Sequence, residues 1–520
     1  MAVISYTAEG RSDALSALGF SEAGRGAERL LREAERSREA RWLRNETELE
    51  DILRRRAFLA VRSLPVLPGR AVLEIGAGSG LWTAHLAAVL GTQNTITAAV
   101  FDEDLARVCS ARNLPGTRCV HVSDFANQFP AGSFDYVFGT DILTDALCSR
   151  ILAAAYGWLK PGGQIVFFGP NPAYPRVSVQ EAFRSGMRRD HSRSLQHPVS
   201  QKQWSDVATQ RGFKDLEGIP CEVIRPANSA SGHVVSLLLE RAPVARKFSK
   251  TITFMAAKPG SLPESTWQVN LATHPALFGA VSVVVPCHNE ESNIGQLVRT
   301  LLGMYGDYIQ EIVIVDDNST DRTAEVTAAI QASEPRVRLL RRKPPSGVGR
   351  ALRDGYAAAR GRYILSMDCD FINIVSEFRR LFDVVADGHD GAIGSRFSSE
   401  SALIRYPFLK IVANRTFHWI LNLLLGKRIR DLSNNLKLYR ADILKNLDIE
   451  ENHFAANAET GLKPLLMGYD IREVPISWID RTSEMGKSSF NILRVGPDYL
   501  RALLRITWRA WRGRYRILHA

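Results

Sequence analysis

Cysteine is scarce in this chain of 520 residues, which contains six. No two of them have the C-x-x-C spacing of zinc sites and redox motifs, which argues against both. Several lie in apolar segments typical of strands, so we expect reduced, buried thiols in a cytoplasmic protein. The six are Cys109, Cys119, Cys148, Cys221, Cys287 and Cys369.

Long apolar runs are also missing. The chain has no uncharged apolar stretch of roughly 18 residues, the length that crosses a bilayer as a helix. Residues 1–20 have neither a basic flank nor an apolar segment, so we expect no secretory signal. The sequence therefore predicts neither a membrane span nor secretion.

Acidic residues are rare from residue 487 onward, where Asp498 is the only one. The whole chain carries a formal net charge of +11, but its 23% charged and 45% hydrophobic residues are ordinary for a globular protein. Because much of the positive charge is local, we expect no nucleic-acid partner. The basic residues of this tail are Lys487, Arg494, Arg501, Arg505, Arg509, Arg512, Arg514 and Arg516.

The length predicts two or three domains. Residues 25–64 are rich in Arg, Glu, Ala and Leu, which favours helix, and we assign residues 1–43 to an N-terminal helical extension. The mixed charges of this region are typical of a solvated helical face.

A glycine-rich turn follows the predicted strand at 71–75. Its sequence is Gly-Ala-Gly-Ser-Gly over residues 76–80, and a helix start follows it. Glycine lets the backbone turn sharply and approach a ligand closely. The spacing is G-x-G-x-G and not the G-x-G-x-x-G of dinucleotide sites. Further strand-like segments follow at 95–101, 120–125, 133–138 and 159–167.

With Glu74 ahead of the turn, this order resembles the class I S-adenosylmethionine-dependent methyltransferases. The resemblance covers residues 44–258 and implies a Rossmann-like fold, completed by strands near 232–239 and 251–256, with S-adenosylmethionine as cofactor. The alternative is such a fold with a lost or different cofactor site. The methyl acceptor is not readable, and residues 171–211 are expected to cover its site. The implied cofactor-binding residues are Glu74, Gly76, Gly78, Gly80, Asp102 on the ribose hydroxyls and Asp124 on the adenine amine.

A linker at 259–279 separates this half from a second α/β domain at 280–490. Three predicted strands, at 281–286, 311–315 and 363–367, are each followed by acidic residues. Parallel strands place such residues at one carboxyl edge, where open α/β sheets bind ligands. The sequence therefore predicts a ligand site at this edge.

Asp368 and Asp370 follow the third of these strands in the sequence Asp-Cys-Asp. Alternate side chains of an extended chain point the same way, so both carboxylates can face one pocket. Hard oxygen ligands of this kind suit Mg²⁺ or Mn²⁺ held together with a substrate phosphate. A loop with two solvated aspartates is the alternative.

The second half resembles the inverting family 2 glycosyltransferases, and within them the dolichyl-phosphate mannose synthases and bacterial polyprenyl-phosphate sugar transferases. The motifs are Pro-Cys-His-Asn-Glu at 286–290, Val-Asp-Asp-Asn-Ser-Thr-Asp at 315–321 and Asp-Cys-Asp at 368–370. Gly-Ser-Arg-Phe at 394–397 and the segment 430–440 also fit. The resemblance implies a mixed-sheet nucleotide-diphospho-sugar transferase fold. It places Pro286, His288, Glu290, Val315, Asp317, Asp368 and Arg396 at the donor, Asp368 and Asp370 at the metal, and Arg481 and Lys487 at the acceptor phosphate or donor diphosphate.

The acceptor decides whether the reaction needs a base. A phosphate monoester is already largely ionised near neutral pH. For a hydroxyl acceptor, the candidate bases are Asp431 and Glu459. The chain departs from the family pattern at His288, where Tyr or Phe is usual, and at Ile372, where relatives often have a polar residue beside the metal.

Two amphipathic segments bear on the acceptor. Residues 408–425 are apolar, but a polar residue recurs every fourth position. In the tail, 491–520, arginines on one helical face oppose Leu and Trp on the other, which is typical of a helix at a membrane interface. A helix docked on its own domain is the alternative.

The combined prediction is a bifunctional enzyme of two doubly wound α/β domains, either cytoplasmic or peripheral on the cytoplasmic face of a membrane. One domain would use S-adenosylmethionine. The other would transfer sugar from a nucleoside-diphosphate sugar to a polyprenyl phosphate, with Mg²⁺ or Mn²⁺. The alternatives are sugar transfer to a soluble metabolite or glycan hydroxyl with methylation of the same product, and a non-catalytic nucleotide-binding scaffold. The oligomeric state is not indicated.

Overall fold

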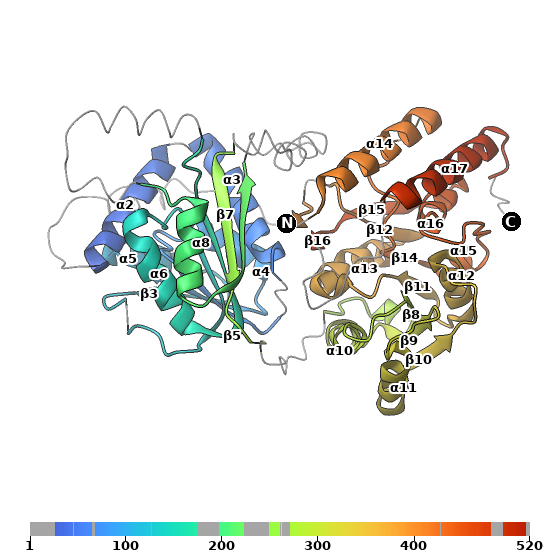
Figure 1. Cartoon of the computed structure of the whole chain (residues 1–520), viewed down its shortest axis with the longest axis horizontal. Helices are drawn as coiled ribbons and strands as arrows, with labels where there is room; N and C mark the ends of the chain where they lie inside the picture. Colours follow the sequence, from blue (N-terminus) through green and yellow to red (C-terminus); the bar gives the residue numbers. More distant parts are fainter. Residues whose placement is uncertain are drawn as a thin grey trace. The chain divides into compact units, whose positions relative to one another are not determined.

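A computed structural model describes most of the chain, and the described residues form two compact units (Figure 1). The first unit holds the described residues up to 262, and the second holds those from 271 onward. The described residues are 27–44, 46–64, 68–125, 127–174, 197–222, 249–260, 262, 271–398, 400–404, 406–426, 428–479 and 492–515.

The first unit is built on a seven-stranded sheet in the order β3-β2-β1-β4-β5-β7-β6. Neighbouring strands from β3 to β5 pair in parallel, and β7 pairs antiparallel with both β5 and β6. The mixed sheet confirms the predicted Rossmann-like class. The strands are β1 (Ala71–Ile75), β2 (Thr95–Val100), β3 (Thr117–His121), β4 (Phe134–Thr140), β5 (Leu159–Pro170), β6 (Lys214–Cys221) and β7 (Thr251–Ala257).

Apolar clusters cover both faces of this sheet, which is why its central strands read as nearly continuous apolar runs. Strand β6 was not predicted, and the strand expected at 232–239 lies outside the described residues. The helices are α2 (Ala27–Arg44), α3 (Glu46–Arg62), α4 (Leu81–Leu90), α5 (Glu103–Ala111), α6 (Asp145–Trp158) and α8 (Gln201–Gln210).

The prediction of a solvated charged face on the N-terminal helices is wrong for α2. Glu35, Arg38 and Glu39 are fully buried, with 0% of each residue exposed. They are buried because α2 packs across the glycine-rich turn, where main-chain groups accept or donate their hydrogen bonds. Charged side chains are rarely buried unless they are paired in this way.

The prediction that all cysteines are reduced is wrong for one pair. Cys109 on α5 and Cys119 on β3 form a disulfide with their Cα atoms 6.2 Å apart. The helix packs beside its following strand, a proximity that their separation in sequence does not reveal. Cys148, Cys221, Cys287 and Cys369 are free and buried, as expected.

The second unit also has a seven-stranded sheet, in the order β10-β9-β8-β11-β14-β12-β15. Strand β14 is antiparallel to β11 and β12, so the sheet is mixed, as the resemblance implies. Strands β8 and β9 are rich in Val and Ile and are almost entirely buried. The strands are β8 (Val281–Cys287), β9 (Ile309–Asp316), β10 (Val337–Arg341), β11 (Tyr363–Ser366), β12 (Gly391–Ser395), β14 (Lys437–Arg440) and β15 (Ile471–Pro475).

A separate two-stranded sheet pairs β13 (Leu403–Ile404) with β16 (Trp478–Ile479). Helices α14 and α17 pack against each other in this unit (Figure 1). The 3₁₀ segments are η3 (Pro275–Leu277) and η4 (Phe371–Phe378). The helices are α10 (Ile294–Tyr305), α11 (Thr323–Ser333), α12 (Val348–Ala358), α13 (Arg379–Ala386), α14 (Phe408–Leu425), α15 (Ala441–Lys445), α16 (Ala456–Leu466) and α17 (Ile492–Trp511).

Candidate functional site

A cavity of about 520 Å³ lies in the second unit, at the edge where β8, β9 and β11 end. Most of the predicted donor and metal residues line it. Helices α14 and α17 supply much of the remaining wall. The predicted residues among those lining the cavity are Pro286, His288, Glu290, Asp317, Asp368, Asp370 and Arg396.

Hydrogen bonds hold the loops after β8 and β9 together. His288 Nδ1 lies 2.9 Å from the carbonyl oxygen of Asp317, and Asn289 Oδ1 accepts from Thr320 N at 2.7 Å. Asp317 Oδ2 accepts from Gly347 N at 2.6 Å, and its other oxygen is paired with Arg342. The rim of the cavity on this side is therefore assembled before any ligand arrives.

The two carboxylates of the Asp-Cys-Asp motif line the same cavity. Asn435 Nδ2 donates to Asp368 Oδ1 at 2.7 Å, and Asp370 immediately precedes η4. Ile372 is buried, so it contributes no ligand. No cluster of three or more His, Cys, Asp or Glu side chains suited to a metal occurs among the described residues. Two carboxylates fit Mg²⁺ or Mn²⁺ when substrate phosphates and waters complete the shell.

One predicted donor residue does not line the cavity, and two predicted residues are not described. Val315 is buried within β9 and does not line the cavity. Arg481 and Lys487 are outside the described residues, so their predicted roles stay predictions.

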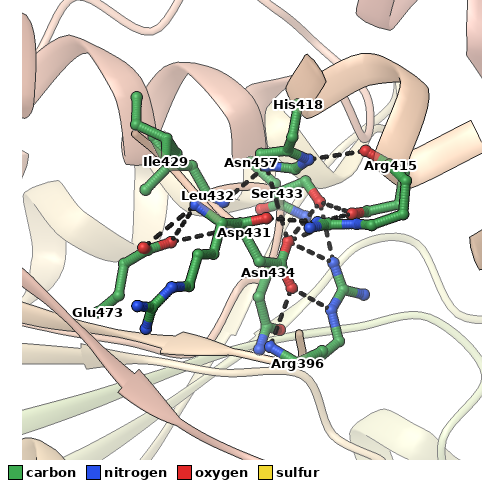
Figure 2. Close-up of polar contacts among 12 residues, drawn as sticks. Arg396, Arg415, His418, Ile429, Asp431, Leu432, Ser433, Asn434, Asn457 and Glu473 are labelled. Atoms are coloured by element: carbon green, nitrogen blue, oxygen red, sulfur yellow. Dashed lines mark hydrogen bonds and ion pairs between the residues drawn. The ribbon is translucent and has the colours of Figure 1, made fainter. Parts of the chain in front are cut away.

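Arg396, which lines the cavity, belongs to a buried network of ion pairs and hydrogen bonds (Figure 2). Arg396 donates from Nε to Asp431 Oδ2 at 2.6 Å and from Nη2 to Asp431 Oδ1 at 2.9 Å. Burial by itself would raise the pKa of Asp431, but the charge and hydrogen bonds of Arg396 outweigh it and hold that pKa well below its usual range. Asp431 is fully buried and does not line the cavity. A carboxylate held this way orients Arg396 and makes a weak base.

Helix α14 completes this network. Asn414 Nδ2 donates to Ser433 Oγ at 3.0 Å, and Ser433 Oγ also accepts from Arg396 Nη2 at 2.9 Å. His418 Nε2 accepts from Leu432 N at 2.9 Å, while its Nδ1 lies 2.8 Å from the carbonyl oxygen of Asn414 (Figure 2). Burial lowers the pKa of His418 to about 4, which keeps the imidazole neutral and able to accept.

The loop that carries Asp431 is fixed from its other side by Glu473. Its carboxylate accepts from Arg430 N at 3.0 Å and from Asp431 N at 2.6 Å (Figure 2).

Nearby, Lys437 is fully buried and donates to Thr460 Oγ1 at 2.8 Å. Burial lowers the pKa of Lys437 to about 7.

The amphipathicity of α14 is the reverse of that of an ordinary surface helix. Its polar residues Asn414, His418 and Asn422 point inward to hydrogen-bond partners. Its large apolar residues face outward, with Trp419 66% and Leu423 70% exposed. Such a helix presents an apolar face to its surroundings.

Helix α17 docks through its arginines. Arg505 Nη2 lies 2.8 Å from Glu451 Oε1 and 3.0 Å from Glu459 Oε1, and Arg509 pairs with Glu450. Glu459 is fully buried by these contacts and does not line the cavity. The alternative of a docked helix expected solvated arginines, and here Arg505 and Arg509 make the docking contacts instead. The apolar residues Leu500, Leu504, Trp508 and Trp511 are exposed.

In the first unit, the glycine-rich turn adopts the backbone that its sequence predicts. Gly76, Gly78 and Gly80 have φ values of +70°, +58° and +79°. Glu74 on β1 is buried, and burial raises its pKa to about 7. Asp124 is exposed and accepts from Asn127 Nδ2 at 3.0 Å.

The turn is already occupied by side chains of this chain. Gly78 N donates to Glu35 Oε1 at 2.9 Å, and Ser79 N donates to Glu39 Oε1 at 3.0 Å. Asp102 Oδ2 accepts from Arg36 Nε at 2.5 Å. With α2 docked, Gly78 N and both carboxylate oxygens of Asp102 therefore have protein partners in the place that the cofactor is predicted to take.

The sequence analysis did not identify several residues that build these sites. Arg342 and Arg415 act through partners that other segments supply, and no local motif marks them. The sequence did indicate the polar face of α14, because a polar residue at every fourth position of an otherwise apolar helix forms an inward polar stripe.

Both units thus have a seven-stranded mixed α/β sheet, and the predicted ligand residues follow strands that pair in parallel. Residues 282–448 match glycosyl transferase family 2, and residues 72–163 match a methyltransferase domain. The chain therefore joins a methyltransferase domain to a family 2 glycosyltransferase domain.

Curated relatives resemble less than half of the chain. The polyprenol monophosphomannose synthase of Mycolicibacterium smegmatis is 27% identical over 239 residues, covering 45% of this chain and 87% of the relative. The dolichyl-phosphate hexose transferase of Haloferax volcanii is 28% identical over 207 residues, covering 40% and 86%. A solved structure, the glucosyl-3-phosphoglycerate synthase of Mycobacterium tuberculosis with uridine diphosphate, is 19% identical with a TM-score of 0.35 and covers 46% of this chain and 87% of that one.

Among the helices of the described residues, none is long and apolar enough to cross a membrane.

Proposed function

We propose that the second unit transfers a sugar from a nucleoside-diphosphate sugar to a polyprenyl phosphate at a membrane surface. One observation carries this proposal. The cavity runs from the acidic sheet edge to α14 and α17, and these two helices expose nine large apolar residues. They are Phe408, Leu409, Val412, Trp419, Leu423, Leu500, Leu504, Trp508 and Trp511.

This apolar surface suits a lipid acceptor. A soluble protein rarely exposes so many large apolar residues on two adjacent helices unless they meet a partner or a membrane. Trp at a membrane interface and basic residues beside it, such as Arg501 and Arg512, are typical of interfacial helices. The names of the two curated relatives, which specify polyprenol and dolichyl phosphate, support the same acceptor class.

The donor would lie along the acidic edge. His288, Glu290 and Asp317 would contact its base and ribose, and Asp368 and Asp370 would hold Mg²⁺ or Mn²⁺ at its diphosphate. A divalent cation supplies charge neutralisation for a departing nucleoside diphosphate.

The acceptor phosphate would lie near Arg396 and Lys410, which line the cavity between the sheet edge and α14. Its ionised oxygen forms a bond to the anomeric carbon as the bond from that carbon to the diphosphate oxygen breaks, with inversion of configuration. No proton has to be removed, so the reaction needs no base. Asp431 and Glu459 would then have structural roles, with Asp431 positioning Arg396.

For the first unit we propose S-adenosylmethionine-dependent methyl transfer at the glycine-rich turn. The support is the match of residues 72–163 to a methyltransferase domain and the left-handed glycines of the turn. The boundary between the two activities would lie in the segment 259–279.

The test is a panel of radiolabelled nucleoside-diphosphate sugars, incubated with undecaprenyl phosphate, Mn²⁺ and the full chain. We expect label to enter the organic phase with one donor. Label on hydroxyl acceptors, with none in lipid across the panel, would contradict the lipid acceptor. The matched control replaces undecaprenyl phosphate with free undecaprenol, which has the same chain and no phosphate.

A further inference from the structure

Helix α2 lies across the predicted cofactor site of the first unit, and one of its carboxylates joins two strand ends. Glu35 Oε1 accepts from Gly78 N at 2.9 Å, in the turn after β1. Glu35 Oε2 accepts from Phe101 N at 2.9 Å and from Asp102 N at 3.0 Å, after β2. The carboxylate therefore joins the carboxyl ends of two adjacent parallel strands, and such folds bind ligands outside the carboxyl ends of their strands.

Two further α2 side chains complete this contact. Glu39 Oε1 accepts from Ser79 N at 3.0 Å, and Glu39 Oε2 accepts from Ser79 Oγ at 3.1 Å. Arg38 donates to the carbonyl oxygen of Gly76 and, at 3.2 Å, to that of Thr140. Gly78 N, Ser79 N and the carbonyl oxygen of Gly76 are thus all hydrogen-bonded to side chains of α2.

The acid predicted to bind the ribose hydroxyls is also engaged. Asp102 Oδ1 caps α5 by accepting from Asp104 N and Leu105 N, each at 3.1 Å. Asp102 Oδ2 accepts from Arg36 of α2. Both oxygens of this carboxylate therefore have protein partners while α2 is docked.

Side chains of α2 also fill the space beside Gly78 that the missing Cβ atom leaves open. A Cβ atom built on Gly78 would lie 2.0 Å from Glu39 Oε1 and 2.6 Å from Arg38 Nη2. A glycine with a left-handed φ and no room for a Cβ is typical of a close approach between backbone and ligand. Here the approaching atoms belong to α2.

We propose that α2 is a self-blocking element whose Glu35 and Glu39 carboxylates occupy the S-adenosylmethionine site, so that cofactor binding and α2 docking exclude each other. This inference rests on the proposal that the turn binds this cofactor. It is independent of the proposed sugar transfer, which is measured on the other unit.

Charged groups are buried at the blocked site. Glu35, Glu39 and Glu74 are buried, and Arg38 is a buried cation that is paired with Glu39. Burial raises the pKa of Glu35 to about 7, and hydrogen bonds and Arg38 offset this only in part. Burial of the Glu35 carboxylate opposes its charged form, so this contact holds α2 less firmly than its number of hydrogen bonds indicates.

The test is calorimetric binding of S-adenosylhomocysteine to the full chain and to its Glu35→Ala, Glu39→Ala double variant. Because a blocked site lowers apparent affinity by the fraction that is open, we expect the variant to bind roughly tenfold tighter or more. The matched control is Glu33→Ala with Glu50→Ala, which removes two carboxylates from solvent-facing positions of α2 and α3. The control should bind like the native chain.

Hydrogen exchange on the native chain supplies a measurement that needs no variant. Saturating S-adenosylhomocysteine should increase amide exchange in the peptide 27–44 while the peptide around Gly78 becomes protected. Ligand binding with unchanged protection of 27–44 would overturn the proposal. The proposal would also be overturned if the native chain and the double variant bound S-adenosylhomocysteine with equal affinity, or if neither bound it. Sugar transfer measured in the same samples shows whether the proposed function of the second unit stands, whatever the outcome for α2.

Discussion

Arg396 and Asp431 form a two-pronged ion pair, with Nε to Oδ2 at 2.6 Å and Nη2 to Oδ1 at 2.9 Å. Both residues are buried, yet Arg396 also lines the cavity. The planar guanidinium is fixed by this fork, which is stronger and more directional than a single charge-assisted bond. The pair thus sets the direction in which a cation faces the ligand.

Asp431→Asn should destabilise the second unit and weaken sugar transfer. The change leaves the Arg396 charge buried without its counterion, and breaking a buried pair costs about 3–5 kcal/mol. Denaturant unfolding followed by tryptophan fluorescence measures the loss. Asp442→Asn, at an exposed pair with Arg440, is the control and should cost less than about 1 kcal/mol. Equal losses of unfolding free energy in the two variants would show that the buried pair contributes no more to stability than the exposed pair.

Asp370→Ala should abolish transfer, reducing kcat/KM by roughly a hundredfold or more, because a cation at the diphosphate stabilises charge in the transition state. The measurement is lipid-extractable label with and without EDTA, followed by readdition of Mn²⁺ or Mg²⁺. Asp387→Ala, at an exposed position after α13, should leave transfer unchanged. Activity of the native chain in EDTA that equals activity in Mn²⁺ would exclude a metal role for Asp370.

His418 should make the second unit less stable in acid. Its imidazole accepts from Leu432 N, and the neighbouring charges are Asp431 and Arg396 on other segments and Arg415 on α14 itself. The folded pKa of about 4 lies below the ordinary value of 6.5, so its contribution is complete above pH 6.5 and is lost as pH falls toward 4. The full effect is on the order of 3 kcal/mol.

Thermal unfolding between pH 4 and 7 tests this pH dependence. A His418→Gln variant lacks the titrating group, so its melting temperature should change less over the same range. A native and a variant profile with the same slope would assign the acid sensitivity to other groups.

Trp419→Ser with Trp511→Ser should weaken binding to anionic vesicles and raise KM for a long-chain polyprenyl phosphate. Each side chain is 66% exposed, so fold stability should change little. Sedimentation with vesicles and kinetics with a water-soluble short-chain acceptor separate surface binding from chemistry. Phe278→Ser, which removes a 45% exposed aromatic outside α14 and α17, is the control. Unchanged vesicle binding in the double tryptophan variant would rule out this surface as the membrane contact.

The positions of the sheet-edge residues could be predicted because they depend on local rules. A strand followed by an acidic turn places its side chains at the carboxyl edge wherever parallel strands pair, and Asp317, Asp368 and Asp370 do line one cavity. Val315 was assigned to the donor from its motif, but alternation along β9 turns it into the core. The strand at Lys214–Cys221 was missed because it contains Gly and Pro and is only partly buried.

The network around Asp431 could not be predicted, because its members come from four separate segments. Arg396 follows β12, His418 lies on α14 and Glu473 lies on β15. Their hydrogen bonds exist only when these elements pack, so no spacing in the sequence relates them. The same holds for Arg505 and Arg509, whose role as anchors depends on glutamates near α16.

By itself the sequence determined two α/β domains, the left-handed glycine turn and the acidic strand ends, because strand periodicity and glycine φ preferences act over a few residues. Only the tertiary structure decided which groups meet those features. It placed Asp368 and Asp370 in one cavity with the apolar helices α14 and α17, and it placed Glu35 and Glu39 on the glycine turn. Burial and main-chain hydrogen bonding are properties of packing, and they place a helix that was expected to face solvent across the glycine-rich turn.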